Sequence, residues 1–229
     1  MKLQFYKTET IYRGKVYKIL TPLTPLKNTY VCLPQGTPFV FANQADFTIL
    51  AGLFTLLTEM KEIIIYLPTR ANQTDYLNQA WAGIGSSSDI VLCHHSLQLK
   101  RGLFKELKKR LSKGSLVSFK VDPMKFSELE FNEKFWHSEN KDLLDVAHQQ
   151  STLFVAGSTK IFEQLARDCL RFRDIHSEVE KPPYHSHTHL EIYLRHGSYP
   201  HFDDMQFCFY DKVWWKKWFA EQEENKDAN

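Results

Sequence analysis

Short apolar runs alternate with amphipathic stretches through most of the chain, a pattern typical of α/β proteins. Strands are predicted at residues 39–42, 63–67, 89–93, 115–121 and 153–156. The run at 63–67 is continuous, mainly β-branched and stopped by Pro68, as expected of a strand that is covered on both faces. Because helical patterns separate these strands, we expect right-handed crossovers and an open, mostly parallel, Rossmann-like sheet flanked by helices.

The helical patterns between the strands have recognisable ends. Asn43 or Asp46 is expected to cap a helix that runs to about Met60. Further helices are predicted at about 75–82, 103–111, 143–147 and 159–172. Gly114 follows the third helical pattern and is expected to stop it.

The two ends of the chain follow different patterns from the middle. Residues 1–28 alternate around Arg13-Gly14 and predict an N-terminal β-ribbon, which precedes an α/β core at 29–175. In 176–222 we expect an antiparallel pair, 190–194 with 205–209, and a tryptophan-rich helix from about Val213. Residues 223–229 are predicted to be a frayed acidic tail. No long linker interrupts the chain, so we expect residues 1–229 to form a single domain.

Composition and charge narrow the classes of protein that fit. The 29 lysines and arginines and 27 acidic residues leave a net charge of +2, so binding to nucleic acid would depend on local patches. The four cysteines are far apart in the sequence and are expected to be reduced thiols. The most apolar segment, 47–57, is about half of the ~20 residues that span a bilayer. We therefore expect a cytoplasmic protein without a membrane partner.

Polar residues follow the predicted strands, at the edge where open α/β sheets bind ligands. In chain order they are Asn43, Thr69, Arg70, His94, His95, Asp122, Gly157, Ser158 and Thr159. Gly157, Ser158 and Thr159 precede a predicted helix and could cradle an anion, although a simple helix cap is the more common role of such residues. If their strands are neighbours, His95, Asp122 and Ser158 could form a base, orienter and nucleophile, with His94 beside them.

Six of the ten histidines fall between His176 and His201. On a strand, His185, His187, His189 and Glu191 would share one face. His185, His187 and Glu191 are the predicted metal ligands, and this donor set suits zinc or iron. Together with Gly197, these residues resemble the first metal motif of the cupins. The α/β pattern and the short remaining chain do not fit a cupin, so we take no activity from the resemblance. A divalent metal is the cofactor that the sequence suggests, and the alternative is a set of solvated or stacked histidines.

A basic stretch follows residue 99 and could contact phosphates. Its predicted contact residues are Lys100, Arg101, Lys105, Lys108 and Lys109. Both this stretch and the lysines and tryptophans of 212–218 also have an ordinary interpretation, as a solvated helix face and as packing.

Three functions remain open from the sequence. The first, which we favour, is binding of a phosphate-bearing ligand, either a nucleotide or nucleic-acid phosphate, at the carboxyl edge of the sheet, with hydrolase activity as an extension. The second is a metal-dependent hydrolase that uses the cluster at 185–191. The third is a non-catalytic accessory protein that binds nucleic acid or another protein.

Overall fold

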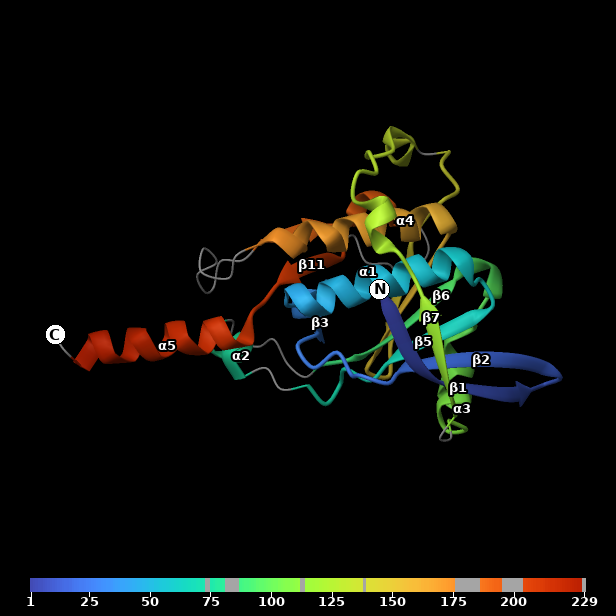
Figure 1. Cartoon of the computed structure of the whole chain (residues 1–229), viewed down its shortest axis with the longest axis horizontal. Helices are drawn as coiled ribbons and strands as arrows, with labels where there is room; N and C mark the ends of the chain where they lie inside the picture. The colour runs from blue at the N-terminus through green and yellow to red at the C-terminus, as the bar shows by residue number, and fades with distance from the viewer. Residues whose placement is uncertain are drawn as a thin grey trace.

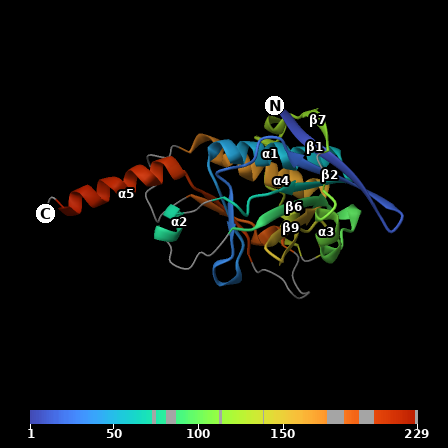
Figure 2. The same cartoon turned by 90° about the horizontal axis from the view of Figure 1, so that it is seen from below.

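The computed structural model describes residues 1–72, 75–80, 87–111, 114–137, 139–175, 186–194 and 204–227. It contains two β-sheets and five α-helices within these residues. The β1–β2 hairpin and helix α5 lie at opposite ends of the molecule in both views (Figures 1 and 2). The predicted helix end at 81–82 and the residues His185 and Gly197 fall outside the described residues.

The larger sheet has seven strands in the order β7-β1-β2-β5-β6-β9-β8. Their bounds are β1 Lys2–Tyr12, β2 Lys15–Pro22, β5 Ile63–Leu67, β6 Asp89–His94, β7 Ser115–Lys120, β8 Asp145–Gln149 and β9 Thr152–Gly157. Only the neighbours β2 with β5 and β6 with β9 are parallel, and the other four pairs are antiparallel. The sheet is therefore mixed, which corrects the expectation of a mostly parallel, Rossmann-like sheet. Periodicity indicates that a run is a buried strand but not the direction of its neighbour.

A smaller sheet has four strands in the order β10-β11-β4-β3. Their bounds are β3 Tyr30–Cys32, β4 Phe39–Ala42, β10 His187–His189 and β11 Gln206–Phe209. The predicted strand at 39–42 thus belongs to this sheet and not to the larger one. The strand predicted at 205–209 corresponds to β11, but its antiparallel partner is β10. The strand predicted at 190–194 is wrong, because Glu191–Tyr193 forms a 3-10 helix, η7.

The α-helices are α1 Gln44–Glu59, α2 Asp75–Ala80, α3 Arg101–Lys108, α4 Thr159–Leu170 and α5 Lys212–Asp227. Shorter 3-10 helices are η1 Pro34–Gly36, η2 His95–Leu97, η3 Pro123–Phe126, η4 Glu133–Trp136 and η5 Arg171–Asp174. The helix predicted at 143–147 is wrong: residues 145–149 form β8, which pairs with β9 through a tight turn. Gln150 and Ser151 in that turn both have a positive φ.

Helices cover the larger sheet on both faces. Alternate residues of β5 divide between two cores: Ile63 and Ile65 pack in the core that contains α1 and α4, whereas Ile64 packs in the core that contains α3. Figure 1 shows α1 and α4 above the strands and α3 below them. All five residues of β5 are buried, which explains why this strand has no polar alternation.

The smaller sheet is also covered on both faces. Val40 and Phe207 pack toward α1, while Phe41 and Cys208 pack with Trp215 from α5. The ring of Trp215 meets Tyr210 edge to face, with centroids 4.9 Å apart. Trp215 is fully buried and therefore acts in packing.

Two expectations about the whole chain can be compared with the structure. All four cysteines are free and buried. Burial raises the pKa of Cys32 to about 12, so this thiol remains protonated at neutral pH. Within the described residues, no helix has both the length and the apolar character that crossing a bilayer requires.

Candidate functional site

Strand direction divides the residues predicted at the sheet edge into two groups. Strands β6 and β9 are parallel, so His94 and Gly157 lie side by side at their carboxyl ends. Strand β5 runs in the opposite direction to β6, so Thr69 and Arg70 lie at the other edge. The predicted site is therefore split, and only the part at the ends of β6 and β9 comes together.

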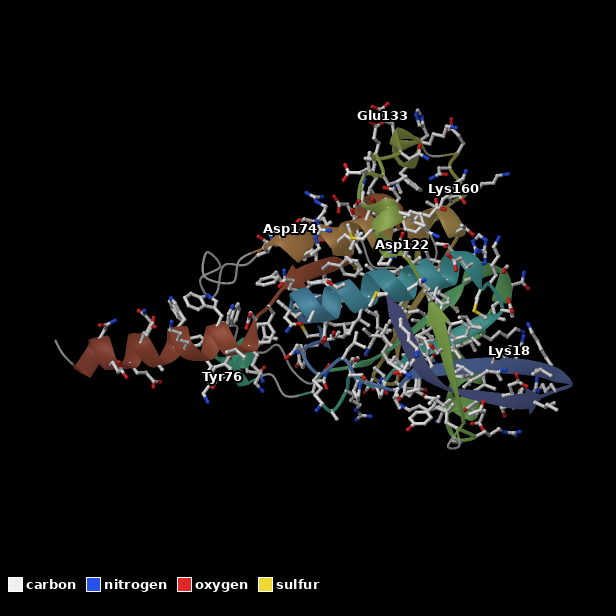
Figure 3. The ribbon with its side chains drawn as sticks, in the orientation of Figure 1. Lys18, Tyr76, Asp122, Glu133, Lys160 and Asp174 are labelled. Carbon is white, nitrogen blue, oxygen red and sulfur yellow. The ribbon has the colours of Figure 1, made fainter. Side chains whose placement is uncertain are left out.

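Asp122 lies far from His94 and His95, because several strands of the sheet separate it from β6. It follows β7, which is four strands from β6, and steps of about 4.8 Å separate the two strands by roughly 19 Å. The Asp122 carboxylate caps η3 by accepting from Met124 N at 3.2 Å, and Figure 3 shows it beside the helical layer. The strands that carry His95, Asp122 and Ser158 are thus not three neighbours, which was the condition for the predicted triad.

Two further predicted residues act as helix caps. Asn43 Oδ1 accepts from Asp46 N at 3.0 Å at the start of α1. Ser158 Oγ accepts from Ile161 N at 3.3 Å at the start of α4. These contacts satisfy amides that the helices leave without a partner, which accounts for both side chains structurally.

His94 is held in one orientation at the end of β6. Its Nδ1 accepts from Ser96 N at 3.2 Å and lies 2.8 Å from Ser96 Oγ. Since a backbone amide can only donate, the ring proton is on Nε2, which faces Thr159 Oγ1 at 3.4 Å. Burial, and then the neighbouring His95 and Lys61, lower the pKa of His94 to about 4, so it is neutral at pH 7.

A buried carboxylate occupies the other edge of the sheet. Asp89 Oδ2 accepts from Tyr66 Oη at 2.9 Å and from Lys108 Nζ at 2.5 Å, while Oδ1 accepts from Arg70 N at 3.0 Å. Thr69 Oγ1 donates to Ser88 O at 2.6 Å beside it. Burial raises the pKa of Tyr66, so its hydroxyl remains protonated and can donate to Asp89. These bonds join β5, β6 and α3.

A hollow near several of the predicted residues lies between the β1–β2 hairpin and the start of α3. We call it the hairpin pocket, and its volume is about 500 Å³. It is lined by Tyr12, Arg13, Lys15, Tyr17, Gln98, Lys100, Gly102 and Leu103. Strand β1 runs in the same direction as β6 and β9, so the hairpin tip reaches the edge at which His94 lies.

The cations of the hairpin pocket are held by their neighbours. Lys15 Nζ donates to Leu97 O at 3.3 Å and lies 5.4 Å from the centroid of the Tyr17 ring. The Arg13 guanidinium lies 5.4 Å from the centroid of the Tyr12 ring. These cation–π contacts reduce the freedom of two long side chains before any ligand arrives. None of the described residues that line the pocket is acidic.

The predicted basic residues differ in what they contact. Three of them have carboxylate partners: Arg101 with Asp145, Lys108 with Asp89, and Lys109 with Glu106. Lys100 lines the hairpin pocket, and Lys105 lines a smaller hollow of about 160 Å³ on the other side of α3. Lys100 and Lys105 are therefore the predicted cations most open to an anion.

The structure describes part of the predicted metal cluster. His187 lies on β10 and Glu191 begins η7, so the two residues are not on one continuous strand. Glu191 instead shares a potential ligand set with His189 and Asp204. His185 is outside the described residues, and the predicted set of His185, His187 and Glu191 stays a prediction.

Sequence reasoning did not single out Arg13 and Lys15 as binding residues. Both were assigned only to a hairpin, because a turn signal at Arg13-Gly14 accounted for them. The signal that could have found them is the series Tyr12, Arg13, Lys15 and Tyr17, which places aromatic and basic residues together at an exposed tip. Asp204 precedes β11 and carried no signal until pairing placed it near His189.

The fold and the hairpin pocket define a mixed α/β protein with a cationic pocket at one end of its larger sheet. Comparisons of the chain with protein-family models, curated proteins and solved structures found no match.

Proposed function

We propose that this protein binds a phosphate-bearing ligand of nucleotide size in the hairpin pocket. The observation that carries the proposal is the charge of the lining: Arg13, Lys15 and Lys100 contribute three cations, and no carboxylate lies among the described lining residues. A volume of about 500 Å³ is in the range of small-ligand sites, which is roughly 300–1,000 Å³. The ligand would lie between the β1–β2 hairpin and the segment that connects β6 with α3.

Binding is better supported than hydrolysis at this pocket. The described lining residues include no histidine, carboxylate, serine or cysteine, the usual general bases and nucleophiles. His94 lies four residues before Gln98 on the same connecting segment, but its Nδ1 is already engaged by Ser96. The pocket therefore resembles a recognition site more than a catalytic centre.

The ligand could be a free nucleotide or a phosphate of single-stranded nucleic acid. Lys105 lies on the other side of α3 from the pocket, so only a polymer that passes around α3 would meet this further cation. Nucleic acid would also show steeper salt dependence, because each neutralised phosphate releases counterions.

The experiment is a titration of the purified protein with adenosine triphosphate and, separately, with a labelled single-stranded oligonucleotide. We expect saturable binding that weakens at least tenfold in the double variant Arg13→Ala, Lys100→Ala. Lys27→Ala, an exposed lysine between β2 and β3, is the matched control and should bind like the unaltered protein. The proposal fails if neither probe binds saturably, or if the double variant and the control bind equally well.

A further inference from the structure

A histidine and two carboxylates meet where the smaller sheet ends, away from the hairpin pocket. His189 ends β10, Glu191 begins η7, and Asp204 comes two residues before β11. One potential ligating atom from each residue lies within 4.8 Å of the other two. His189 pairs with Gln206 across the sheet, so the strand register itself brings Asp204 near the imidazole.

Only one of the two oxygens of the Asp204 carboxylate has hydrogen-bond partners among the described residues. Its Oδ2 lies 2.7 Å from His189 Nδ1 and accepts from Gln206 Nε2 at 2.8 Å. Its Oδ1 is buried and has no hydrogen-bond partner in the described part of the chain. A buried carboxylate oxygen without a donor is unfavourable, and a bound cation would remove that cost.

Two exposed side chains next to Asp204, those of His189 and Glu191, supply further potential ligand atoms for a metal ion. Glu191 is exposed, and none of the described residues forms a hydrogen bond or ion pair with its carboxylate. The His189 side chain is 47% exposed, so an ion from solvent can reach the group. The contact between His189 and Asp204 accounts for one oxygen of Asp204, but it gives no role to Oδ1 or to Glu191.

We propose that His189, Glu191 and Asp204 bind a divalent transition-metal ion, with Zn²⁺ as the type case. One imidazole nitrogen with two carboxylate oxygens suits first-row transition metals, whereas Mg²⁺ and Ca²⁺ prefer oxygen ligands alone. Ligand atoms about 2.1 Å from a zinc ion lie about 3–4 Å from one another, so atoms within 4.8 Å need only a small closure. Three protein ligands leave a coordination position for water or another molecule.

This site is independent of the hairpin pocket. Strand β11 lies on the α5 side of the molecule, whereas the hairpin projects at the other end (Figures 1 and 2). Its partner strand β10 carries His189, so the metal group belongs to the smaller sheet and the pocket to the larger one. Loss of one site therefore need not affect the other.

The test is calorimetric titration of untagged, metal-stripped protein with Zn²⁺, together with Co²⁺ absorption spectra. We expect one Zn²⁺ site that weakens at least tenfold in His189→Ala and in Asp204→Asn. The control is His137→Ala, which removes an exposed histidine that is not in the metal group. This control should bind Zn²⁺ like the unaltered protein, and the Co²⁺ spectrum should show tetrahedral or five-coordinate bands that both ligand variants lose.

A third variant keeps the proposal testable if the first two fail to fold. Glu191→Gln changes an exposed side chain and should leave the thermal midpoint unchanged while it weakens Zn²⁺ binding. The proposal is overturned if the unaltered protein shows no saturable Zn²⁺ binding or if the folded ligand variants bind like the control. Equal affinity for Mg²⁺ would overturn the assignment to a transition metal.

Discussion

Lys15 Nζ donates a hydrogen bond to the backbone carbonyl of Leu97 at 3.3 Å, across 82 positions of the sequence. This contact joins the β1–β2 hairpin to the segment that connects β6 with α3. Because of it, a cation from the hairpin and a cation from the start of α3 face the same pocket. The proposed phosphate site therefore depends on the docking of the hairpin as well as on charge.

Lys15→Ala should weaken the binding of a phosphate-bearing probe about tenfold or more. A hydrogen bond to a charged group is worth about 1.5–3 kcal/mol, and this variant also frees the hairpin from Leu97. Oligonucleotide affinity measured at several salt concentrations should show a slope reduced by about 1 if Lys15 contacts a phosphate. Lys15→Arg should keep most of the affinity. An unchanged salt slope in Lys15→Ala would place the phosphate elsewhere.

His94 should make the protein less stable in mild acid. Burial lowers the pKa of His94 to about 4, from an ordinary value of 6.5. Between these values the unfolded chain binds a proton that the folded chain does not bind, so the free energy of unfolding falls as the pH drops from about 6.5 to about 4. The stabilising contribution of the neutral His94 imidazole to the folded protein is therefore fully present only above pH 6.5.

Denaturant unfolding at a series of pH values checks this effect. His94→Gln removes the titrating group and should flatten the dependence in that window, although it also alters the contacts with Ser96 and Thr159. His137→Gln removes an exposed histidine that is not among the groups that shift the pKa of His94, and it serves as the control. If the control flattens the dependence as much as His94→Gln does, His94 is not the group responsible.

Asp89→Ala should lower the free energy of unfolding by about 2–4 kcal/mol. The substitution leaves Tyr66 Oη and Arg70 N without their acceptor, and Lys108 loses its ion-pair partner. Glu106→Ala breaks a surface ion pair with Lys109 and should cost less than about 1 kcal/mol. Chemical denaturation of both variants measures the two free energies of unfolding. Similar losses of stability would mean that the contacts of Asp89 contribute no more than the surface ion pair between Glu106 and Lys109.

Gly114→Ala and Gly102→Ala should change stability in opposite directions. A Cβ at position 114 would overlap the backbone carbonyl of Lys7 on β1, so the β1–β7 edge must shift and the thermal midpoint should fall. A Cβ at position 102 would meet nothing within 4 Å, and alanine in α3 should add up to about 1 kcal/mol. Thermal unfolding distinguishes the two cases, and a stable Gly114→Ala protein would contradict this packing.

The apolar pattern was a good guide to local structure. Runs at 63–67 and 89–93 are buried strands, and the stripe that contains Phe104 and Leu107 is the buried face of α3. These results follow because burial on one or both faces requires a matching period in the side chains. The segment at 145–149 was misassigned to a helix, because its pairing with β9 outweighed a weak local preference.

The candidate sites could be predicted less well from the sequence than the strands and helices, because the sites depend on which strands are neighbours. Placing Thr69, His94 and Asp122 at one edge assumed parallel strands. The antiparallel pairing of β5 with β6 moves Thr69 to the other edge, and the position of β7 takes Asp122 several strands away. Only His94 and the residues after β9 remain together, because those two strands are parallel.

The sequence by itself determined the α/β class of the chain, most of its strand and helix positions, and the residue types available for binding. These are local properties, set by side-chain periodicity and by capping residues such as Asn43 and Ser158. Only the tertiary structure decided which of those residues meet. Strand direction and pairing bring Lys15 to Leu97 and Asp204 to His189, and such long-range contacts arise from the packing of whole elements and leave no periodic signal along the chain.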